Sequence, residues 1–259
     1  MTTARAKKAP AAGWPRQLLR LLALVLLCVL ALQLTFALRI LAMNVLDPQS
    51  TAFQRSEAWR LLQDDRPLRW RQEWVDAPRL SVHLKRAVIA SEDAAFASHG
   101  GVDWESIEKA WERNQRAEAR AQRQQAARPP GARKVEPKVI GGSTITQQLA
   151  KNLFLSGERT APRKAQEFVL TLMLEGLLSK QRLLEIYLNS VEWGEGVFGA
   201  QAAARHHFRT DAARLGPEQA ARLAVMLPAP KRFEKLPGSP YVAARTATIV
   251  ARMGAVELP

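Results

Sequence analysis

The chain has 259 residues, which is enough for one domain with a buried core plus an anchor or a tail. Its hydrophobic content of 47% excludes a wholly disordered chain, and its single cysteine, Cys28, excludes a disulfide framework or a multi-cysteine metal centre. The formal net charge of +14 leaves open nucleic acid, a membrane surface or an anionic substrate as partner. Most of the excess lies in residues 1–46 and 112–138. Because the rest is close to neutral, a nucleic-acid-binding face spread over the core is not expected.

The N-terminal segment is predicted to cross a membrane once. Residues 21–38 are 18 consecutive uncharged and mostly aliphatic residues, and a helix of that length spans about 27 Å, close to the hydrocarbon thickness of a bilayer. Arg20 and Arg39 bracket the run, and further basic residues precede it. The positive-inside rule places residues 1–20 in the cytoplasm and the remainder across the membrane. A cleaved signal peptide is the alternative, but no small-x-small cleavage pattern follows the run.

Helix signals dominate the rest of the chain, so the fold is predicted to be mostly α. Residues 39–77 are expected to form a membrane-proximal connector, and residues 78–259 a single domain. Capping residues and apolar periodicity predict helices that begin near residues 80, 103, 144, 162, 179, 217 and 240. No alternating series long enough for a strand is present, and the glycines at 194, 196 and 199 indicate a tight turn into a helix.

Residues 114–138 form a basic insertion within this domain. They are rich in Arg, Gln and Ala and contain a Pro-Pro-Gly turn. We expect an extension of the preceding helix followed by a mobile basic loop. A solvated linker and an anion-contacting segment are equally good interpretations of this run of charge.

An acidic pair, Glu92 and Asp93, follows an apolar helical pattern and precedes Phe96, His99 and two glycines. On a helix, Glu92 and Phe96 share a face because they are four residues apart. A carboxylate beside an aromatic ring is partly desolvated, which raises its pKa and suits it to accept a proton at neutral pH. A solvated helix cap is the alternative interpretation.

Two further segments combine polar and basic residues. Residues 141–152 begin with two glycines and small polar side chains at a helix start, which predicts an anion-receptive helix N-terminus with Lys151 further along. An ordinary capped helix is the alternative, and the spacing is not that of a phosphate-binding Walker loop. Arg163, Lys164 and Glu167 share one helix face, which is also the pattern of a surface ion-pair ladder.

Taken in this order, the segments resemble the peptidoglycan glycosyltransferases of glycosyltransferase family 51. The family pattern Glu-Asp-x-x-Phe-x-x-His-x-Gly matches residues 92–101, and Gly-Gly-Ser-Thr-x-Thr-Gln-Gln-x-x-Lys-Asn matches 141–152. Arg-Lys-x-x-Glu matches 163–167, and Lys-x-x-x-Leu-Glu-x-Tyr-Leu-Asn matches 180–189. The resemblance runs from about residue 78 to the last residue. We therefore expect a monofunctional member without a transpeptidase domain.

The resemblance implies a mostly α, lysozyme-like domain that polymerises glycan strands from lipid II and releases undecaprenyl pyrophosphate with inversion at the donor sugar. It implies Glu92 as the general base and Glu167 as a second catalytic glutamate of less certain role. Lys151 and Arg163 match positions that face the leaving pyrophosphate. The full set of implied substrate-binding residues is Asp93, Phe96, His99, Ser143, Thr144, Gln148, Lys151, Asn152, Arg163 and Lys164.

The implied partners are lipid II, the growing glycan strand, the bacterial inner membrane and other cell-wall synthesis proteins, with no nucleic acid. The catalytic domain is expected in the periplasm. No protein metal cage is predicted, and it is left open whether Mg²⁺ or Mn²⁺ accompanies the pyrophosphate. A lytic transglycosylase that cleaves peptidoglycan is the alternative function, and it has no need of pyrophosphate contacts from Lys151 and Arg163.

Overall fold

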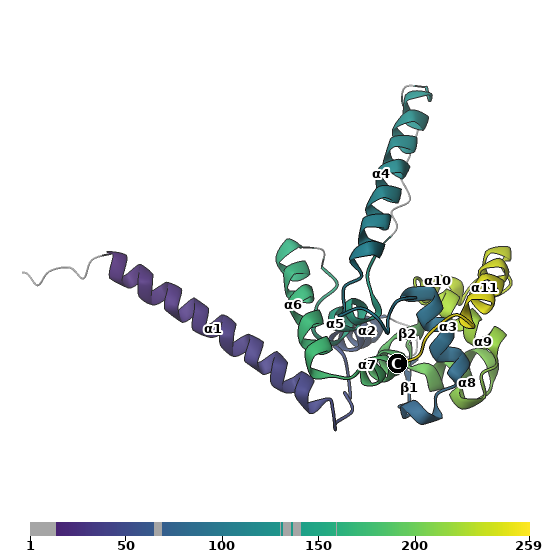
Figure 1. Ribbon diagram of the computed structural model, residues 1–259, viewed down its shortest axis with the longest axis horizontal. Helices are drawn as coiled ribbons and strands as arrows, with labels where there is room; N and C mark the ends of the chain where they lie inside the picture. Colours follow the sequence, from purple (N-terminus) through teal and green to yellow (C-terminus); the bar gives the residue numbers. More distant parts are fainter. Residues whose placement is uncertain (1–13, 65–68, 130, 132–135, 137–140, 159) are drawn as a thin grey trace, which may run out of the picture.

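The computed structural model describes residues 14–64, 69–129, 131, 136, 141–158 and 160–259 (Figure 1). Helices dominate these residues, which confirms the mostly α prediction. The helices are α1 (Trp14–Ala42), α2 (Ala52–Leu62), α3 (Val82–Glu92), α4 (Trp104–Ala126), α5 (Ile145–Phe154), α6 (Ala161–Leu177), α7 (Lys180–Ser190), α8 (Ala200–Phe208), α9 (Pro217–Met226), α10 (Pro230–Phe233) and α11 (Pro240–Met253). Short 3-10 helices lie at Ala77–Arg79 and Ala212–Arg214.

The helix starts predicted from capping signals are confirmed. At α5, the Thr144 hydroxyl accepts from the Gln147 N–H, and the Gln147 side chain accepts from the Thr144 N–H. Asp103 caps α4 and Ser179 caps α7 in the same way, each accepting from a backbone N–H of the first turn. These bonds satisfy N–H groups that have no partner within the helix, which is why the caps mark the starts.

A small three-stranded sheet is an element that the sequence did not predict. β1 (Arg71–Gln72) runs parallel to β3 (Val197–Phe198), and β2 (Glu192–Gly194) runs antiparallel to it, in the order β1-β3-β2. Strands of two or three residues are too short to show an alternating pattern. The predicted glycine turn is present as the turn of the β2–β3 hairpin, which leads into α8.

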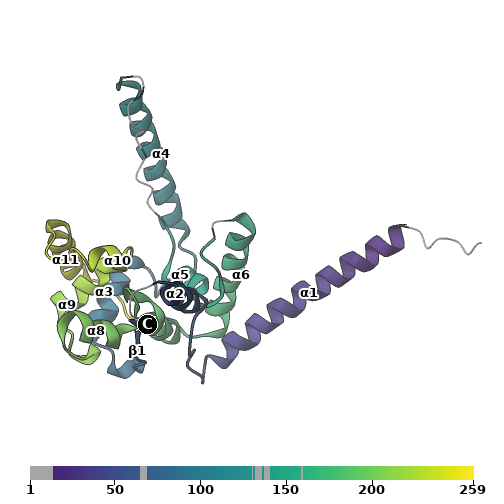
Figure 2. The ribbon, with the colours of Figure 1, turned by 180° about the vertical axis from the view of Figure 1, so that it is seen from behind.

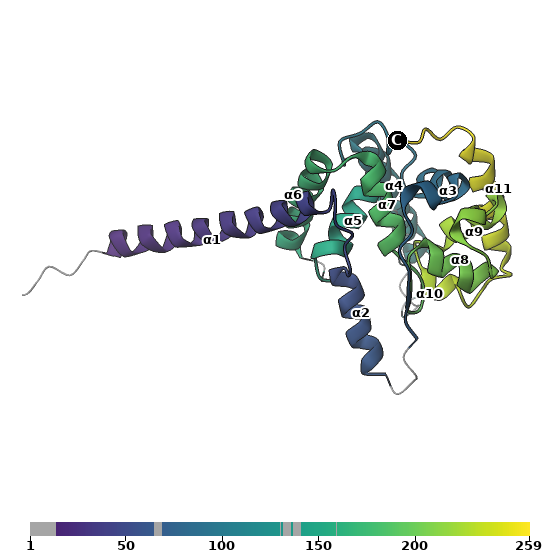
Figure 3. The ribbon, with the colours of Figure 1, turned by 90° about the horizontal axis from the view of Figure 1, so that it is seen from below.

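Two groups of helices make up the body of the molecule. α3, α9 and α11 pack against one another, and α5 packs against α2, α6 and α7. Figure 1 shows the two groups on opposite sides of α7, and Figure 3 shows α2 reaching below α5. α3 ends where these groups meet, so Glu92 is placed between them.

The basic insertion begins as a helix, as predicted. α4 continues to Ala126 and projects away from the body in Figures 1 and 2. Most of its side chains beyond Trp111 are exposed to solvent. The loop that is predicted to follow falls largely on residues 130, 132–135 and 137–140, which lie outside the described residues.

α1 is longer than the predicted span of 21–38, because the helix continues at both ends. Its segment Arg16–Ala42 is long and apolar enough to cross a membrane, judged by length and composition. The last turns of α1 pack on the body instead of standing free. Ile40 is fully buried, and the rings of Phe36 and Phe154 meet edge-on at 5.3 Å.

Truncation should separate the anchoring part of α1 from its packing part. Removal of residues 1–30 is expected to leave the melting temperature near that of the full chain. Removal of residues 1–46 also takes away the buried Ile40 and Met43 and the partly buried Phe36. This longer truncation should lower the melting temperature, because a fully buried apolar side chain contributes about 1.5–3 kcal/mol. Thermal unfolding of both truncated chains in one detergent measures the difference. Equal melting temperatures would show that α1 contributes nothing to the body.

A cluster of charges ties α2 to the hairpin. Lys231 Nζ lies 2.5 Å from a Glu57 oxygen and 3.5 Å from a Glu192 oxygen. Glu192 is buried, and this burial raises its pKa to about 7 even though the charge of Lys231 opposes the rise. The neighbouring charge of Glu57 adds to it. The folded protein therefore holds a proton on Glu192 at pH values where a solvated glutamate has released it.

Because the folded protein must lose this proton as the pH rises, its stability should fall with pH. Between the ordinary pKa of 4.5 and about 7, the folded chain binds more protons at Glu192 than the unfolded chain, so the free energy of unfolding falls with pH. The difference amounts to about 3 kcal/mol. Glu192→Gln should remove this contribution. Melting temperatures of both proteins from pH 5 to pH 8 test it, and parallel curves would contradict it.

Candidate active site

Glu92 is the last residue of α3, and its carboxylate is held by a side chain of α5. Gln148 Nε2 donates to Glu92 Oε2 at 2.9 Å, and the Ser91 hydroxyl donates to Oε1 at 3.5 Å. Burial raises the pKa of Glu92 above its ordinary value, while these hydrogen bonds and the charge of Arg245 lower it part of the way back. A half-buried carboxylate with a raised pKa is suited to accept a proton near neutral pH.

The predicted helical pairing of Glu92 with Phe96 is wrong, because α3 ends at Glu92 and a turn follows over residues 94–98. Phe96 is fully buried beneath this turn. Lys180 Nζ lies 4.5 Å from the centre of its ring, and His99 meets the ring edge-on at 6.4 Å. Phe96 therefore anchors the turn from below, and its burial leaves no ring surface for a substrate.

Asp93 fixes the start of α5. Its Oδ1 accepts from His99 Nε2 at 2.8 Å, and its Oδ2 accepts from the Ile145 N–H at 3.0 Å. The Thr144 hydroxyl donates to the Gly101 carbonyl at 2.6 Å. The N-terminus of α5, which is predicted to bind an anion, is therefore already occupied by the carboxylate of Asp93. Asp93 and Thr144 are 7% and 2% exposed, and their polar atoms form hydrogen bonds within the protein. This differs from the predicted role of both residues in binding the substrate.

α5 carries the remaining polar residues of its motif along the face that meets Glu92. Lys151 and Asn152 lie three and four residues beyond Gln148, so their side chains follow it one turn, about 5.4 Å, further along the helix. Lys151 is exposed and Asn152 is half-buried. Ser143 is exposed just ahead of the cap. The structure therefore places an exposed cation about one helical turn from the residue that holds the Glu92 carboxylate.

Glu167 is a buried partner of two cations at the start of α6. Its Oε2 accepts from Arg163 Nη1 at 3.0 Å, and its Oε1 accepts from Lys164 Nζ. Glu167 itself is only 3% exposed, whereas the Lys164 side chain is largely exposed. The arrangement is not a solvated ladder, because the shared carboxylate lies inside the protein. It orients the two cations and neutralises part of their charge.

A polar contact joins the last turns of α6 to the first turn of α5. Thr146 on α5 donates to Glu175 Oε1 at 2.5 Å, and Lys180 donates to the same oxygen at 2.9 Å. Glu175 and Glu167 are eight residues apart on α6, so they share a face that is turned toward α5. Sequence analysis did not identify Glu175, because it lies outside the motifs. Its spacing of eight residues from Glu167 could have indicated that the two glutamates lie on the same side of one helix.

Sequence reasoning also missed Arg245. This residue lies on α11, and its charge lowers the pKa of Glu92. No sequence motif marks it, and only the packing of α11 against α3 brings it near the carboxylate. Arg245 adds a cation to the Glu92 side of the site.

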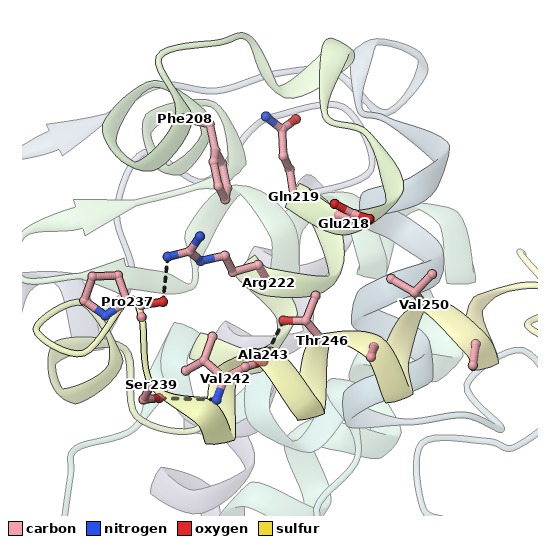
Figure 4. A pocket seen from close by; sticks show the side chains of 13 residues that line it. Phe208, Glu218, Gln219, Arg222, Pro237, Ser239, Val242, Ala243, Thr246 and Val250 are labelled. Atoms are coloured by element: carbon pink, nitrogen blue, oxygen red, sulfur yellow. Dashed lines mark hydrogen bonds between the residues drawn. The ribbon is translucent and has the colours of Figure 1, made fainter.

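A separate cavity of about 610 Å³ lies between α9 and α11 (Figure 4). Phe208, Val242 and Val250 line it, and Arg222 crosses one side to donate to the Pro237 carbonyl at 2.7 Å. None of the residues implied by the motifs lines this cavity. Among the described residues, no group of three or more His, Cys, Asp or Glu side chains is placed to hold a metal ion.

The fold and site define an α-helical enzyme with an apolar N-terminal helix and a half-buried carboxylate, Glu92, on which the charge of Arg245 acts. Comparison with known families narrows this class. The family model described as transglycosylase matches residues 65–254, and the chain therefore belongs to the transglycosylase family.

Curated relatives match along most or all of their length. A protein of Paraburkholderia xenovorans (strain LB400) named biosynthetic peptidoglycan transglycosylase is 47% identical over 260 residues, which covers the whole of both chains. A protein of the same name from Burkholderia multivorans is 51% identical over 89% of this chain and 86% of the relative. One from Burkholderia thailandensis is 52% identical over 89% and 83%.

Proposed function

We propose that this chain polymerises the glycan strands of peptidoglycan. The observation that carries the proposal is Glu92, a half-buried carboxylate with a raised pKa that is held by Gln148, with the exposed Lys151 about one helical turn beyond Gln148 on α5. Full-length similarity to proteins named biosynthetic peptidoglycan transglycosylase supports it. The chemistry such a site favours is the transfer of a sugar from an anionic, pyrophosphate-linked donor to a hydroxyl group.

In the proposed reaction, lipid II or the growing strand is the donor and a second lipid II is the acceptor. Glu92 takes the proton of the acceptor GlcNAc 4-hydroxyl while that oxygen attacks C1 of the donor MurNAc. The bond from C1 to undecaprenyl pyrophosphate breaks, and attack from the opposite face gives a β-1,4 link. Base catalysis of this kind contributes about 10²–10⁴-fold to the rate.

The leaving pyrophosphate gains negative charge as the bond breaks, and fixed cations stabilise it. Lys151, Arg163 and Lys164 serve this purpose in the proposal, with Glu167 orienting the latter two. Each oxygen of Glu167 already accepts from a cation, so the two cations neutralise the charge that this carboxylate would offer to a divalent ion.

The proposed location is the bacterial inner membrane, with the N-terminus in the cytoplasm and the domain on the outer side. Exposed apolar side chains continue from α1 onto α6, where Phe168, Val169 and Leu172 face solvent. Trp104 of α4 joins them, 6.5 Å from the Phe168 ring. A lipid-linked substrate is confined to the bilayer, so a tethered enzyme meets it at a raised effective concentration.

Product analysis tests the proposal. The purified full chain in detergent is given lipid II labelled in the GlcNAc unit. We expect a polymer that a muramidase specific for β-1,4 links digests to disaccharides, and one undecaprenyl pyrophosphate released for each link formed. Absence of polymer under conditions that support a characterised relative would contradict the proposal.

A further inference from the structure

Tyr187 lies behind the residue that holds Glu92. It belongs to α7, it is fully buried, and its hydroxyl donates to Gln148 Oε1 at 2.9 Å. Gln148 on α5 in turn donates from Nε2 to Glu92 Oε2 at 2.9 Å. Side chains of three helices thus form one hydrogen-bonded series that ends on the carboxylate of α3.

The donors and acceptors fix the direction of this series. An ionised carboxylate can only accept, so the Gln148 amide must turn its NH₂ group toward Glu92 and its oxygen toward Tyr187. The Tyr187 hydroxyl is then the donor that satisfies this amide oxygen. If the amide flipped, its oxygen would face the carboxylate. Among the described contacts, the Tyr187 hydroxyl would then have no acceptor.

We propose that Tyr187 is a positioning residue for sugar transfer, which acts through Gln148 to keep an N–H group on the Glu92 carboxylate. Tyr187 does not touch the substrate, because its side chain is enclosed by the core. The inference rests on the proposed function, in which Glu92 is the base. In this role the hydroxyl orients the Gln148 amide, which the packing of the tyrosine ring alone would not do.

Loss of the hydroxyl should alter the titration of Glu92. Burial raises the pKa of Glu92, and the hydrogen bond from Gln148 opposes this rise. Of the charged groups that face Glu92, Asp93 raises its pKa and Arg245 on α11 lowers it. Tyr187 itself stays protonated, because burial and the charges of Glu92 and Asp93 hold its pKa well above the ordinary value. An amide released from Tyr187 is free to turn, which weakens its bond to the ionised carboxylate and raises the pKa of Glu92.

Tyr187→Phe removes the hydroxyl and keeps the ring that fills the core. A net hydrogen bond contributes about 1 kcal/mol, so we expect kcat/KM for lipid II at neutral pH to fall roughly fivefold. The acid limb of the pH–rate profile should move to higher pH, and the rate should recover toward the wild-type value once Glu92 is ionised. The matched control is Tyr241→Phe, because Tyr241 is the other tyrosine of the chain and is exposed. It should leave both rate and profile unchanged.

Direct titration separates the inference from the proposed function. Carbon-13 NMR of carboxyl-labelled glutamates in the full chain follows Glu92, with Glu92→Gln identifying its signal. We expect Tyr187→Phe to raise the Glu92 midpoint, and to have no further effect once Gln148→Leu is present. An unchanged midpoint would overturn the inference whatever the activity. A raised midpoint with an unmoved pH–rate profile would instead overturn the role of Glu92 as the base.

Discussion

Glu92→Gln is expected to lower the rate of glycan polymerisation by about 10² or more, while the binding of a pyrophosphate-bearing lipid changes little. The amide keeps the shape of the side chain but cannot take a proton from the acceptor hydroxyl. Gln148 can still donate to the amide oxygen, so the local packing should survive. Single-turnover sugar transfer and lipid binding, measured side by side at neutral pH, give the two quantities.

Two controls make this result specific. The melting temperature of Glu92→Gln should stay near that of the wild type, because no apolar volume is removed. Glu108→Gln makes the same chemical change at an exposed position on α4 and should leave turnover intact. Near-normal turnover of the Glu92→Gln protein would contradict the assignment of the base.

Gly196→Ala is expected to destabilise the fold by at least about 3 kcal/mol. Gly196 has a φ of +71°, a region that other residues rarely occupy, and a Cβ atom there would lie 1.9 Å from the Arg69 carbonyl oxygen. That oxygen belongs to the backbone, so it cannot turn aside as a flexible side chain would. The Arg71 N–H donates to the Gly196 carbonyl at 2.8 Å. The methyl group should therefore push β1 away from the hairpin.

Urea unfolding of the purified variant measures this loss. Gly176→Ala is the matched control, because Gly176 lies within α6 and nothing would lie within 4 Å of its Cβ atom. Alanine in a helix interior is favoured over glycine by about 0.5–1 kcal/mol, so this control should be neutral or slightly stabilising. If both variants unfold at the wild-type midpoint, the close approach at Gly196 does not constrain the hairpin.

The helices were predictable because their signals are local. A cap such as Thr144 and its Gln147 partner lie within one turn, and the sequence shows both. The sheet was not predictable, because β1 pairs with β3 from a distant part of the chain and all the strands are too short to carry a period of two. The packing of α1 on α6 also escaped prediction. It depends on contacts such as the two hydrogen bonds between the Gln33 and Gln166 amides.

The motifs identified which residues belong together but not how each one is used. Glu92 and Gln148 come from separate motifs, and the structure joins them by a hydrogen bond. Asp93 is turned toward the α5 N-terminus, because the chain after α3 folds back over that helix. Burial could not be deduced for a charged residue such as Glu167, since charged side chains are usually exposed. Arg245 lies in a segment without a motif, and tertiary packing alone reveals it.

The most direct test of glycan synthesis gives the full chain two substrates in parallel, lipid II and finished uncrosslinked glycan strands. The length of the glycan products and the amount of undecaprenyl pyrophosphate are measured over the same time course. We predict that lipid II is converted to polymer with release of the pyrophosphate, that the finished strands keep their length, and that Glu92→Gln abolishes the conversion. Shortening of the finished strands with no consumption of lipid II would contradict the account and identify a cleaving enzyme.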